Sequence, residues 1–84
     1  FGETIDLNFQ QIPLSEALTI YADYTGKNLV IDSSIYEIID LRLHGVKPDD
    51  VLEVFVSMYE LVTTQHKNII TIMKRENFES RHQP

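Results

Sequence analysis

A pattern that occurs twice, 34 residues apart, constrains the fold of this 84-residue sequence more than any other feature. Apolar and polar residues alternate over 5–9 and again over 39–43, and after a short break apolar residues recur at helical spacing over 14–22 and 48–56. A period of two followed by a period of about 3.6 predicts a strand and then a helix in each copy. The copies share only four identical aligned residues, so the repeat is one of pattern rather than of established ancestry. Because a solenoid requires about three or more copies, we expect one compact domain of two packed strand–helix units.

Length, charge and cysteine content exclude several kinds of function. A chain of this length forms one domain that hides only about 60–65% of its unfolded surface, so its stability is marginal but attainable. There is no cysteine, which excludes disulfides and thiolate metal sites. A formal net charge of −6 repels the phosphates of nucleic acids and anionic membranes. No apolar run approaches the ~20 residues of a membrane span and no signal peptide opens the sequence, so we expect a piece of a longer protein whose signal, if exported, has been removed.

Prolines and glycines predict where the two helices begin and end. Pro13 and Pro48 suit the first turn of a helix, where the missing N–H has no cost. Gly26 is expected to end the first helix in the left-handed conformation, with Lys27 near the negative end of the helix dipole. Gly45 is expected to break the chain before the second helix. The apolar stripes are Leu14, Ala17, Leu18, Tyr21 and Ala22 in the first helix, and Val51, Leu52, Phe55, Val56 and Tyr59 in the second.

Three further strands, together with an extension of the second repeat strand to residue 37, complete the expected order of strand, helix, strand, strand, helix, strand, strand. Residues 28–31 are apolar and β-branched, which predicts a short buried strand, and residues 37–43 alternate. Residues 62–65 and 69–73 flank a polar turn and predict a hairpin in which Asn68 tolerates a positive φ.

The C-terminal segment is polar and lacks periodicity. We therefore assign residues 1–74 to one folded domain and residues 75–84 to a polar linker or tail. The element order predicts the α+β class.

No arrangement of residues predicts catalysis, a metal site or a cofactor. The three histidines lack the spacing of metal ligands, and the three glycines are too scattered to cradle a phosphate. Asp49 and Asp50 are adjacent, so they point to different sides of a helix, and the helix dipole explains them. We therefore expect no enzyme.

The four tyrosines divide into two groups. Tyr21 and Tyr59 lie in the helical stripes and are expected in the core, while Tyr24 and Tyr36 are not assigned by the pattern. A stacking surface for nucleic-acid bases would require accompanying basic residues, which the sequence does not supply.

Unpaired strand edges are the feature that most suggests an interaction. Small sheets of short strands have edges that offer backbone donors and acceptors to a partner, and residues 5–9 form a natural docking edge. Alternatively, the outward residues Asp6 and Asn8 only keep this strand soluble and discourage pairing. The residues alone leave both interpretations open.

One stretch is more specific than the rest: Thr25-Gly26-Lys27-Asn28-Leu29-Val30-Ile31-Asp32. Together with Leu7-Asn8-Phe9, Ile12-Pro13-Leu14 and Ala17-Leu18 before it, and Leu41-Arg42-Leu43, Val51-Leu52 and Asn68-Ile69-Ile70-Thr71-Ile72 after it, this stretch resembles the first periplasmic domain of secretins. Secretins are the outer-membrane channels of type II secretion, type IV pili and related DNA-uptake machines. The resemblance covers about residues 4–73.

The resemblance implies two helices held between a two-stranded and a three-stranded sheet. It also implies that copies form a ring in the full-length channel and bind an inner-membrane component of the secretion or pilus machine, without cofactor, nucleic acid or direct membrane contact. The isolated domain is expected to stay monomeric. The partner-binding residues implied at the strand edges are Thr4, Asp6 and Asn8 on the first strand and Asp40, Arg42 and His44 on the third.

A second family shares part of the pattern. The Ile-Pro-Leu…Ala-Leu helix start, at residues 12–18, is similar to the N-terminal signalling domain of TonB-dependent outer-membrane transducers, whose partner is an anti-sigma regulator. Residues 25–32 favour the secretins. The segment that follows the domain would separate the two families, because secretins continue into further periplasmic domains and transducers into a plug and barrel.

Overall fold

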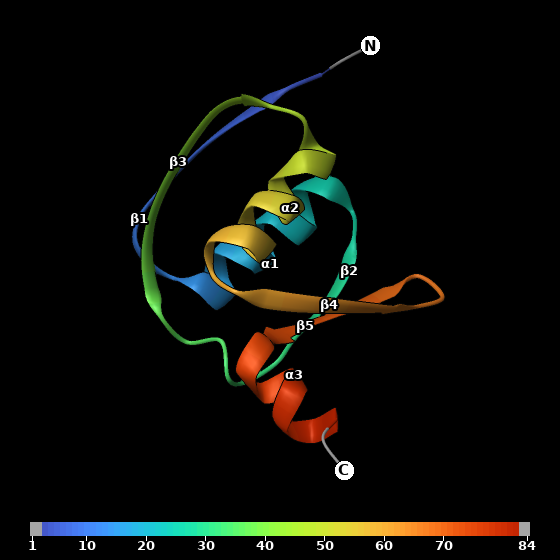
Figure 1. Cartoon of the computed structure of the whole chain (residues 1–84). Helices are drawn as coiled ribbons and strands as arrows, with labels where there is room; N and C mark the ends of the chain where they lie inside the picture. The colour runs from blue at the N-terminus through green and yellow to red at the C-terminus, as the bar shows by residue number, and fades with distance from the viewer. Residues whose placement is uncertain (1–2, 83–84) are drawn as a thin grey trace.

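Two helices lie between two small sheets in the computed structural model, which describes residues 3–82 (Figure 1). The elements are β1 (Ile5–Pro13), α1 (Leu14–Thr25), β2 (Asn28–Ile31), β3 (Ile38–Val46), α2 (Pro48–Met58), β4 (Leu61–His66), β5 (Ile69–Lys74) and α3 (Arg75–His82). The predicted class and the predicted order through the second hairpin strand are confirmed. Phe1, Gly2, Gln83 and Pro84, which the predicted domain and tail include, lie outside the described residues.

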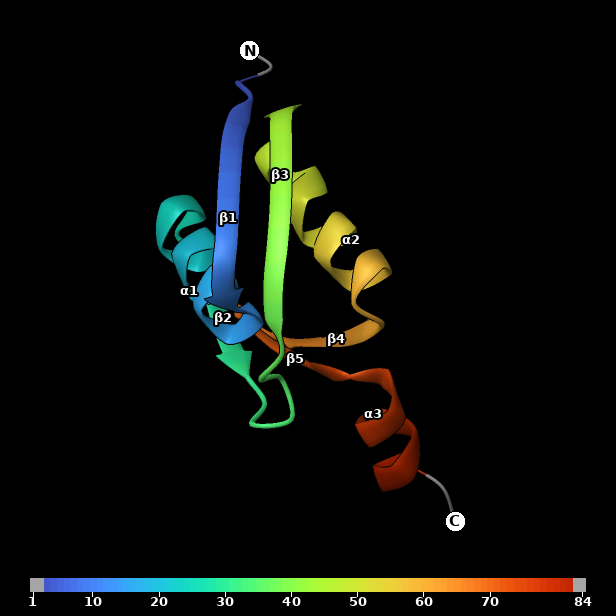
Figure 2. The ribbon, with the colours of Figure 1, turned by 90° about the vertical axis from the view of Figure 1, so that its left-hand side faces the viewer.

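The strands form one antiparallel pair and one mixed sheet. β1 pairs with β3, and β5 lies between β2, to which it is parallel, and β4, to which it is antiparallel. The expectation of a two-stranded and a three-stranded sheet is therefore confirmed. In Figure 2, β1 and β3 face the viewer, with α1 behind β1 and α2 behind β3.

Phe55 of α2 lies at the centre of the core. Its ring centroid is 6.4 Å from that of Phe9 on β1, 6.3 Å from that of Tyr21 on α1 and 6.3 Å from that of Tyr59. Tyr21 is fully buried and Tyr59 packs against the core, as the stripes predicted. Aromatic pairs at such distances stabilise a fold by about 0.5–1.5 kcal/mol beyond the area they bury.

The sequence repeat appears in the fold as a symmetric strand register. Asn8 pairs with Arg42, its own counterpart in the repeat. On either side of this pair, Ile5 pairs with Val46 and Ile12 pairs with Ile39. These two pairs are equivalent in the repeat, because Ile39 is the counterpart of Ile5 and Val46 is the counterpart of Ile12. The two halves of this sheet are thus related by an approximate two-fold axis that passes between Asn8 and Arg42.

Unusual backbone angles follow the same symmetry. Gln11 (φ 54°) and Gly45 (φ 64°) are one repeat apart, and so are Gly26 (φ 74°) and Glu60 (φ 52°). The first pair lies at register shifts of β-bulge type, and the second pair follows the two helices. Backbone geometry therefore repeats even where the residue type does not.

Of the four helix boundaries predicted from prolines and glycines, two are confirmed and two are wrong. Gly26 ends α1, since its N–H donates to the carbonyl of Ala22 at 2.8 Å, and Pro48 is the first residue of α2. Pro13 instead lies in β1 with an extended backbone, one residue before the helix. Gly45 does not break the chain, because the bulge accommodates its positive φ and β3 continues to Val46.

Three other expectations need correction. The strand 28–31 is not buried, because it is an edge strand on which Val30 is 52% exposed. In the hairpin the residue with positive φ is Lys67, not Asn68. The segment 75–82, expected as an unstructured polar stretch, forms α3, whose first N–H donates to the carbonyl of Glu60 at 2.8 Å. That α3 leads out of the domain as a linker stays a prediction.

Candidate docking surface

The outward face of the β1–β3 sheet brings most of the predicted partner-binding residues together. Burial alternates along both strands, with apolar residues facing the helices and polar residues facing outward. The outward set comprises Asp6 and Asn8 on β1 and Asp40, Arg42 and His44 on β3, all exposed. Thr4 is exposed as well and lies just before β1. Figure 2 is viewed onto this face, which no other element covers.

Two of these residues have a structural task that the sequence did not reveal. Asp6 Oδ1 accepts a hydrogen bond from the backbone N–H of Gly45 at 2.7 Å. Asp40 Oδ1 accepts one from the backbone N–H of Gln11 at 2.9 Å, and the Gln11 side chain also donates to both Asp40 oxygens, at 3.3 and 3.0 Å. Each aspartate thus fixes the bulge of the opposite strand, and both are symmetry equivalents under the repeat.

The remaining polar residues are weakly tied to the fold. His44 Nδ1 lies 3.2 Å from Asp6 Oδ1, but the two side chains are 90% and 65% exposed, so the contact contributes little. Asn8 Oδ1 accepts a long hydrogen bond of 3.4 Å from Gln10. Asn8 and Arg42 are exposed and help to line a shallow hollow, together with Gln10, Gln11 and Asp40. They are better placed than the aspartates to meet a partner.

Both strands of this sheet have a free outer edge, and each edge has a helix beside it. Successive residues on a helix turn by about 100°, so Ile20 and Tyr24 lie on the flank of α1 opposite Ala22, which lines a groove along β2. That flank faces the β1 side, and α1 packs against β1 (Figure 2). Ile20 is 43% and Tyr24 65% exposed. The sequence pattern assigns neither Tyr24 nor Ile20 to the core or to a binding surface.

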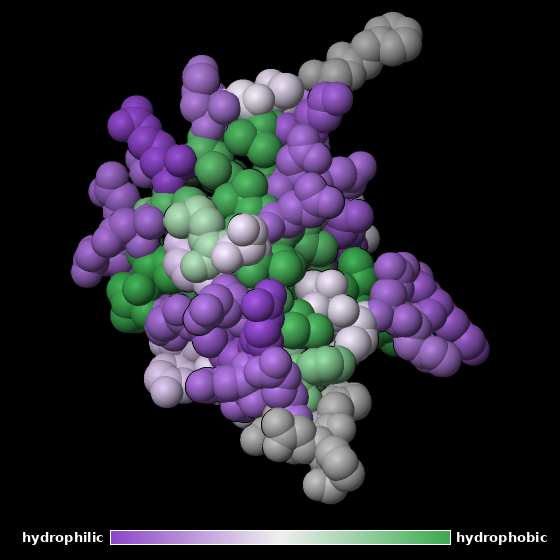
Figure 3. Space-filling view, viewed as in Figure 1, coloured by the Kyte–Doolittle hydropathy of each residue, from purple (hydrophilic) through white to green (hydrophobic). Residues whose placement is uncertain are grey.

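The helix α2, which lies behind β3 in Figure 2, has a comparable flank. Val54 and Met58 are the repeat counterparts of Ile20 and Tyr24, and they lie on the side of α2 opposite Val56. Met58 is 55% exposed and Val54 is half-buried. Figure 3 shows apolar surface between polar side chains on the face of the molecule formed by α2.

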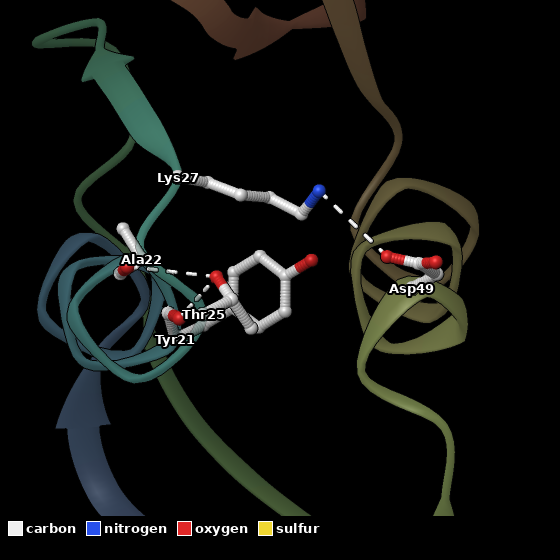
Figure 4. A network of polar contacts seen from close by, with 5 residues as sticks. All are labelled: Tyr21, Ala22, Thr25, Lys27 and Asp49. Atoms are coloured by element: carbon white, nitrogen blue, oxygen red, sulfur yellow. Dashed lines mark hydrogen bonds and ion pairs between the residues drawn. The ribbon is translucent and has the colours of Figure 1, made fainter. Parts of the chain in front are cut away.

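The two helices are joined on the side away from this sheet by a small polar network (Figure 4). Lys27 Nζ lies 3.7 Å from Asp49 Oδ1, and the Thr25 hydroxyl donates to the carbonyl of Tyr21 at 2.9 Å. The Tyr21 hydroxyl is buried and has no hydrogen-bond partner among the described residues. Burial first, and then the negative charge of Asp49, raise the pKa of Tyr21. The nearby Thr25 hydroxyl donates to backbone carbonyls and not to the phenol. A neutral phenol in an apolar setting packs the core and offers no chemistry.

Lys74 is a second residue whose role the sequence did not reveal. As the last residue of the predicted domain it carried no sign of a partner, yet its ammonium donates to Glu37 Oε1 at 2.9 Å and to the carbonyl of Tyr59 at 2.7 Å. Its side chain is only 20% exposed. Lys74 therefore ties β5 to the loop before β3 and to the end of α2.

The described part of the chain contains neither a metal-binding cluster nor a membrane-spanning helix. Within residues 3–82 no three histidine, aspartate or glutamate side chains are grouped so that they could hold a metal ion. No helix over the same residues has the length and apolar character needed to cross a membrane.

Known proteins resemble this chain in sequence and in fold. No protein-family model matches the chain. The fimbrial assembly protein PilQ of Pseudomonas aeruginosa (strain PAO1) is 30% identical over 80 residues, which cover 95% of this chain and 11% of that protein. The type IV competence pilus secretin PilQ of V. cholerae is 36% identical, with a TM-score of 0.78 over 89% of this chain and 18% of that one.

The N0 domain of the type II secretin of enterotoxigenic Escherichia coli has the same fold at 10% identity, with a TM-score of 0.72 over 84% of this chain and 94% of that domain. A putative anti-sigma factor of Parabacteroides distasonis, at 15% identity and a TM-score of 0.69, shares the fold alone.

Sequence and fold together assign the chain to the N-terminal periplasmic domains of outer-membrane secretins. Within that class its sequence is related to the pilus secretin PilQ. The chain spans only 11% of one PilQ and 18% of the other, so it corresponds to one part of such a protein.

Proposed function

We propose that this domain docks an inner-membrane component of a type IV pilus, DNA-uptake or type II secretion machine to the secretin channel that carries the domain. The observation that carries the proposal is the free outer edge of β1, flanked by an exposed polar face on one side and by Ile20 and Tyr24 on the other. The relation to PilQ favours a pilus or competence machine among these systems.

An edge of this kind suits the addition of a strand. Unpaired backbone donors and acceptors of an edge strand bind an extended segment, and side-chain pockets beside the edge supply specificity. Side chains on one face of an added strand would pack on Ile20 and Tyr24, and those on the other face would meet Asn8 and Arg42. Both sets are exposed, so docking would not require the core to open.

The role is mechanical, and the domain would act as one of many copies. In the full-length channel neighbouring copies form a ring, so weak contacts per copy add up to strong attachment through avidity. The isolated domain should remain monomeric, since copies with a net charge of −6 repel one another. The same charge disfavours a grip on DNA, even in a machine that moves DNA.

A pull-down of the purified domain with periplasmic fragments of inner-membrane pilus and secretion proteins tests the proposal. Tyr24→Asp should abolish capture, because a carboxylate would replace the apolar contact beside β1. Tyr36→Asp is the matched control, since Tyr36 is 78% exposed and lies in the loop before β3. Circular dichroism should show both variants folded. Asp6 is unsuitable for this test, because its loss would disturb the bulge at Gly45.

Three outcomes are informative. Loss of capture by Tyr24→Asp with normal capture by Tyr36→Asp supports docking at β1. Equal capture by both variants excludes that edge. Capture of the periplasmic domain of an anti-sigma regulator, and of no pilus or secretion component, would instead indicate the signalling domain of an outer-membrane transducer.

A further inference from the structure

Acidic side chains are distributed unevenly between the two sheets. The chain has 13 aspartates and glutamates, yet none of them lies in β2, β4 or β5, the strands of the three-stranded sheet. The other sheet exposes Asp6 and Asp40, and α1 and α2 expose further carboxylates: Glu16, Asp23, Asp49, Asp50 and Glu53. Copies with a net charge of −6 repel one another, and the repulsion is weakest where carboxylates are absent. The ends of the three-stranded sheet are therefore where a second copy meets the least repulsion.

The edge strand β4 lacks the features that usually prevent an edge from pairing. Edge strands are commonly protected by charges, prolines, bulges or short length. β1 and β3 have bulges and outward aspartates, and β2 has only four residues. β4 has six residues in unbroken register with β5, and its last four, residues 63–66, are exposed and include no proline, carboxylate, lysine or arginine. In Figure 1 the hairpin of β4 and β5 extends past the helices, which leaves this edge open to a partner strand.

The opposite edge of the same sheet, β2, lies in a groove. The groove runs between α1 and the start of β5, and its lining includes Thr19, Asp23, Val30 and Ile69. β2 is parallel to β5 and β4 is antiparallel to it. A second copy placed beside the first in the same orientation therefore brings its β2 antiparallel to β4 of the first.

The strand register continues across such a contact. Within one copy, Val30 pairs with Thr71, and Thr71 pairs with Thr64, so these three residues form one row across the sheet. Continuing the row places Val30 of the second copy opposite Thr64 of the first. Leu29 and Ile31 pack against the core, so Val30 and the rest of its row face away from the helices. Two copies can thus share one extended sheet without opening either core.

We propose that neighbouring copies of this domain contact each other head to tail, with β4 of one copy added to β2 of the next. The contact is heterologous, because it joins two different surfaces, and a heterologous contact builds a ring when the rotation between copies closes. The inference rests on the ring in the proposed function and adds the surfaces that form it. The edge of β1 stays free for the inner-membrane partner, since Ile20 and Tyr24 lie on the flank of α1 opposite the groove.

Charges at the end of the contact are complementary. Lys67 lies in the turn after β4, and the hairpin from Leu61 to Lys74 contains no carboxylate. In the shared sheet this turn comes to the end of the groove at which Asp23 of the next copy is exposed. Lys27 lies there too, but its ammonium is directed toward Asp49 of α2, at 3.7 Å (Figure 4). Lys67 therefore meets a carboxylate.

Disulfide trapping tests the contact, because the chain has no cysteine of its own. Thr64→Cys and Val30→Cys each place one thiol at an exposed position on one of the two edges. Opposed residues of antiparallel strands have Cα atoms about 4.5–5.5 Å apart, which is within reach of a disulfide. We expect the mixed disulfide to form on the order of tenfold faster than that of Thr64→Cys with Tyr36→Cys, an exposed loop position. Trapping detects contacts too weak to persist in the isolated domain.

A chain with both substitutions, Val30→Cys and Thr64→Cys, should form a ladder of dimers, trimers and longer species. The two thiols of one chain cannot join, because β5 separates them by about 9–10 Å. Lys67→Glu should slow the growth of the ladder, and Lys47→Glu, at an exposed position before α2, is the matched control and should not.

A second pair of thiols guards against an effect of one substitution on folding. Asn28→Cys and His66→Cys lie in the next row of the same face, since both residues pair with Ile69. Circular dichroism should show all the variants folded, and this pair should form a mixed disulfide as readily as the first.

Three results decide the inference. Mixed disulfides that form faster than the Tyr36→Cys control and faster than either homodimer support it. Mixed disulfides no faster than that control would overturn it. Homodimers of Thr64→Cys that outpace the mixed species would also overturn it, because β4 would then pair with itself in a closed dimer that builds no ring. The pull-down reports separately on docking at β1, so failure of one proposal is distinguishable from failure of the other.

Discussion

The carboxylate of Asp6 on β1 accepts a hydrogen bond from the backbone N–H of Gly45 on β3, 39 positions further along the chain, at 2.7 Å. The contact fixes a bulge in the strand that lies beside it, and Asp40 does the same for Gln11 in the opposite direction. Both aspartates are exposed, and exposure alone would have assigned them to a partner. Instead they stabilise the shape of the docking face.

Removal of either aspartate should destabilise the domain. Asp6→Ala and Asp40→Ala each leave a bulge N–H without its acceptor, and we expect a loss of about 1 kcal/mol in the free energy of unfolding. Asn8→Ala is the matched control on the same face and should change stability by less than about 0.5 kcal/mol. Urea unfolding followed by circular dichroism measures all three. Equal stability of Asp6→Ala and Asn8→Ala would show that the bulge does not depend on the carboxylate.

Tyr21→Phe should leave stability unchanged or raise it by up to about 1 kcal/mol. The hydroxyl is buried without a partner among the described residues, so its removal abolishes a desolvation cost and keeps the ring contact with Phe55. Phe55→Leu is the reference for losing that ring contact and should be clearly destabilising. A loss above about 1 kcal/mol for Tyr21→Phe would mean that the hydroxyl has a stabilising partner.

The raised pKa of Tyr21 also predicts how the stability of the domain changes at alkaline pH. Burial raises the pKa of Tyr21 above the ordinary value of 10.0, and burial followed by the charges of Glu37 and Asp40 raises the pKa of Tyr59. The unfolded state then loses its phenolic protons first, so stability is complete below pH 10 and falls as the pH rises from there through the folded-state values. Tyr21→Phe should reduce the slope of this fall. Chemical denaturation between pH 8 and about 11 measures it, and an unchanged slope would contradict the assignment.

Lys74 should contribute more to stability than other lysines. Its ammonium is largely buried between Glu37 and the Tyr59 carbonyl, so Lys74→Met is expected to cost about 1–2 kcal/mol. Lys47→Met, at an exposed position, is the control and should be nearly neutral. Thermal or urea unfolding gives the comparison, and equal losses for the two variants would rule out a special role for Lys74.

Substitutions at Gly26 and Glu60, which are equivalent positions of the repeat, should change stability in opposite directions. Gly26→Ala has room for the new methyl group but forces an alanine to a φ of 74°, which should cost about 1 kcal/mol. Glu60→Gly relieves the same strain and should stabilise the fold by several tenths of a kcal/mol. Glu53→Gly, in the interior of α2, is the control and should destabilise by about 1 kcal/mol. A loss of stability in Glu60→Gly would contradict the strain.

The elements that periodicity controls were predictable from the sequence, and the features set by distant partners were not. The helices follow from stripes such as that of Leu14, Leu18 and Tyr21, and the strands follow from alternation. The bulge at Gly45 looked like a strand end, because its stabilising carboxylate, Asp6, lies on another strand. The helix α3 has no apolar stripe, and contacts with β4 and β5 hold its start.

The candidate site was predictable to a similar degree. Alternation placed Asp6, Asn8 and Arg42 on one exposed face, as the structure shows. The helix flank beside β1 was missed, because Ile20 and Tyr24 gain their meaning only once α1 is packed against that strand. No local signal in the sequence distinguishes an exposed tyrosine beside a free edge from one in a loop, such as Tyr36.

Amide hydrogen exchange of the domain, with and without the periplasmic fragment of a pilus inner-membrane protein, tests the central claim most directly. Docking by strand addition should slow exchange along β1, whose outward amides gain partners, and leave the amides of β2 and β4 unchanged. Slowed exchange at β2 or β4 with none at β1, or no change with any pilus or secretion fragment, would contradict the account.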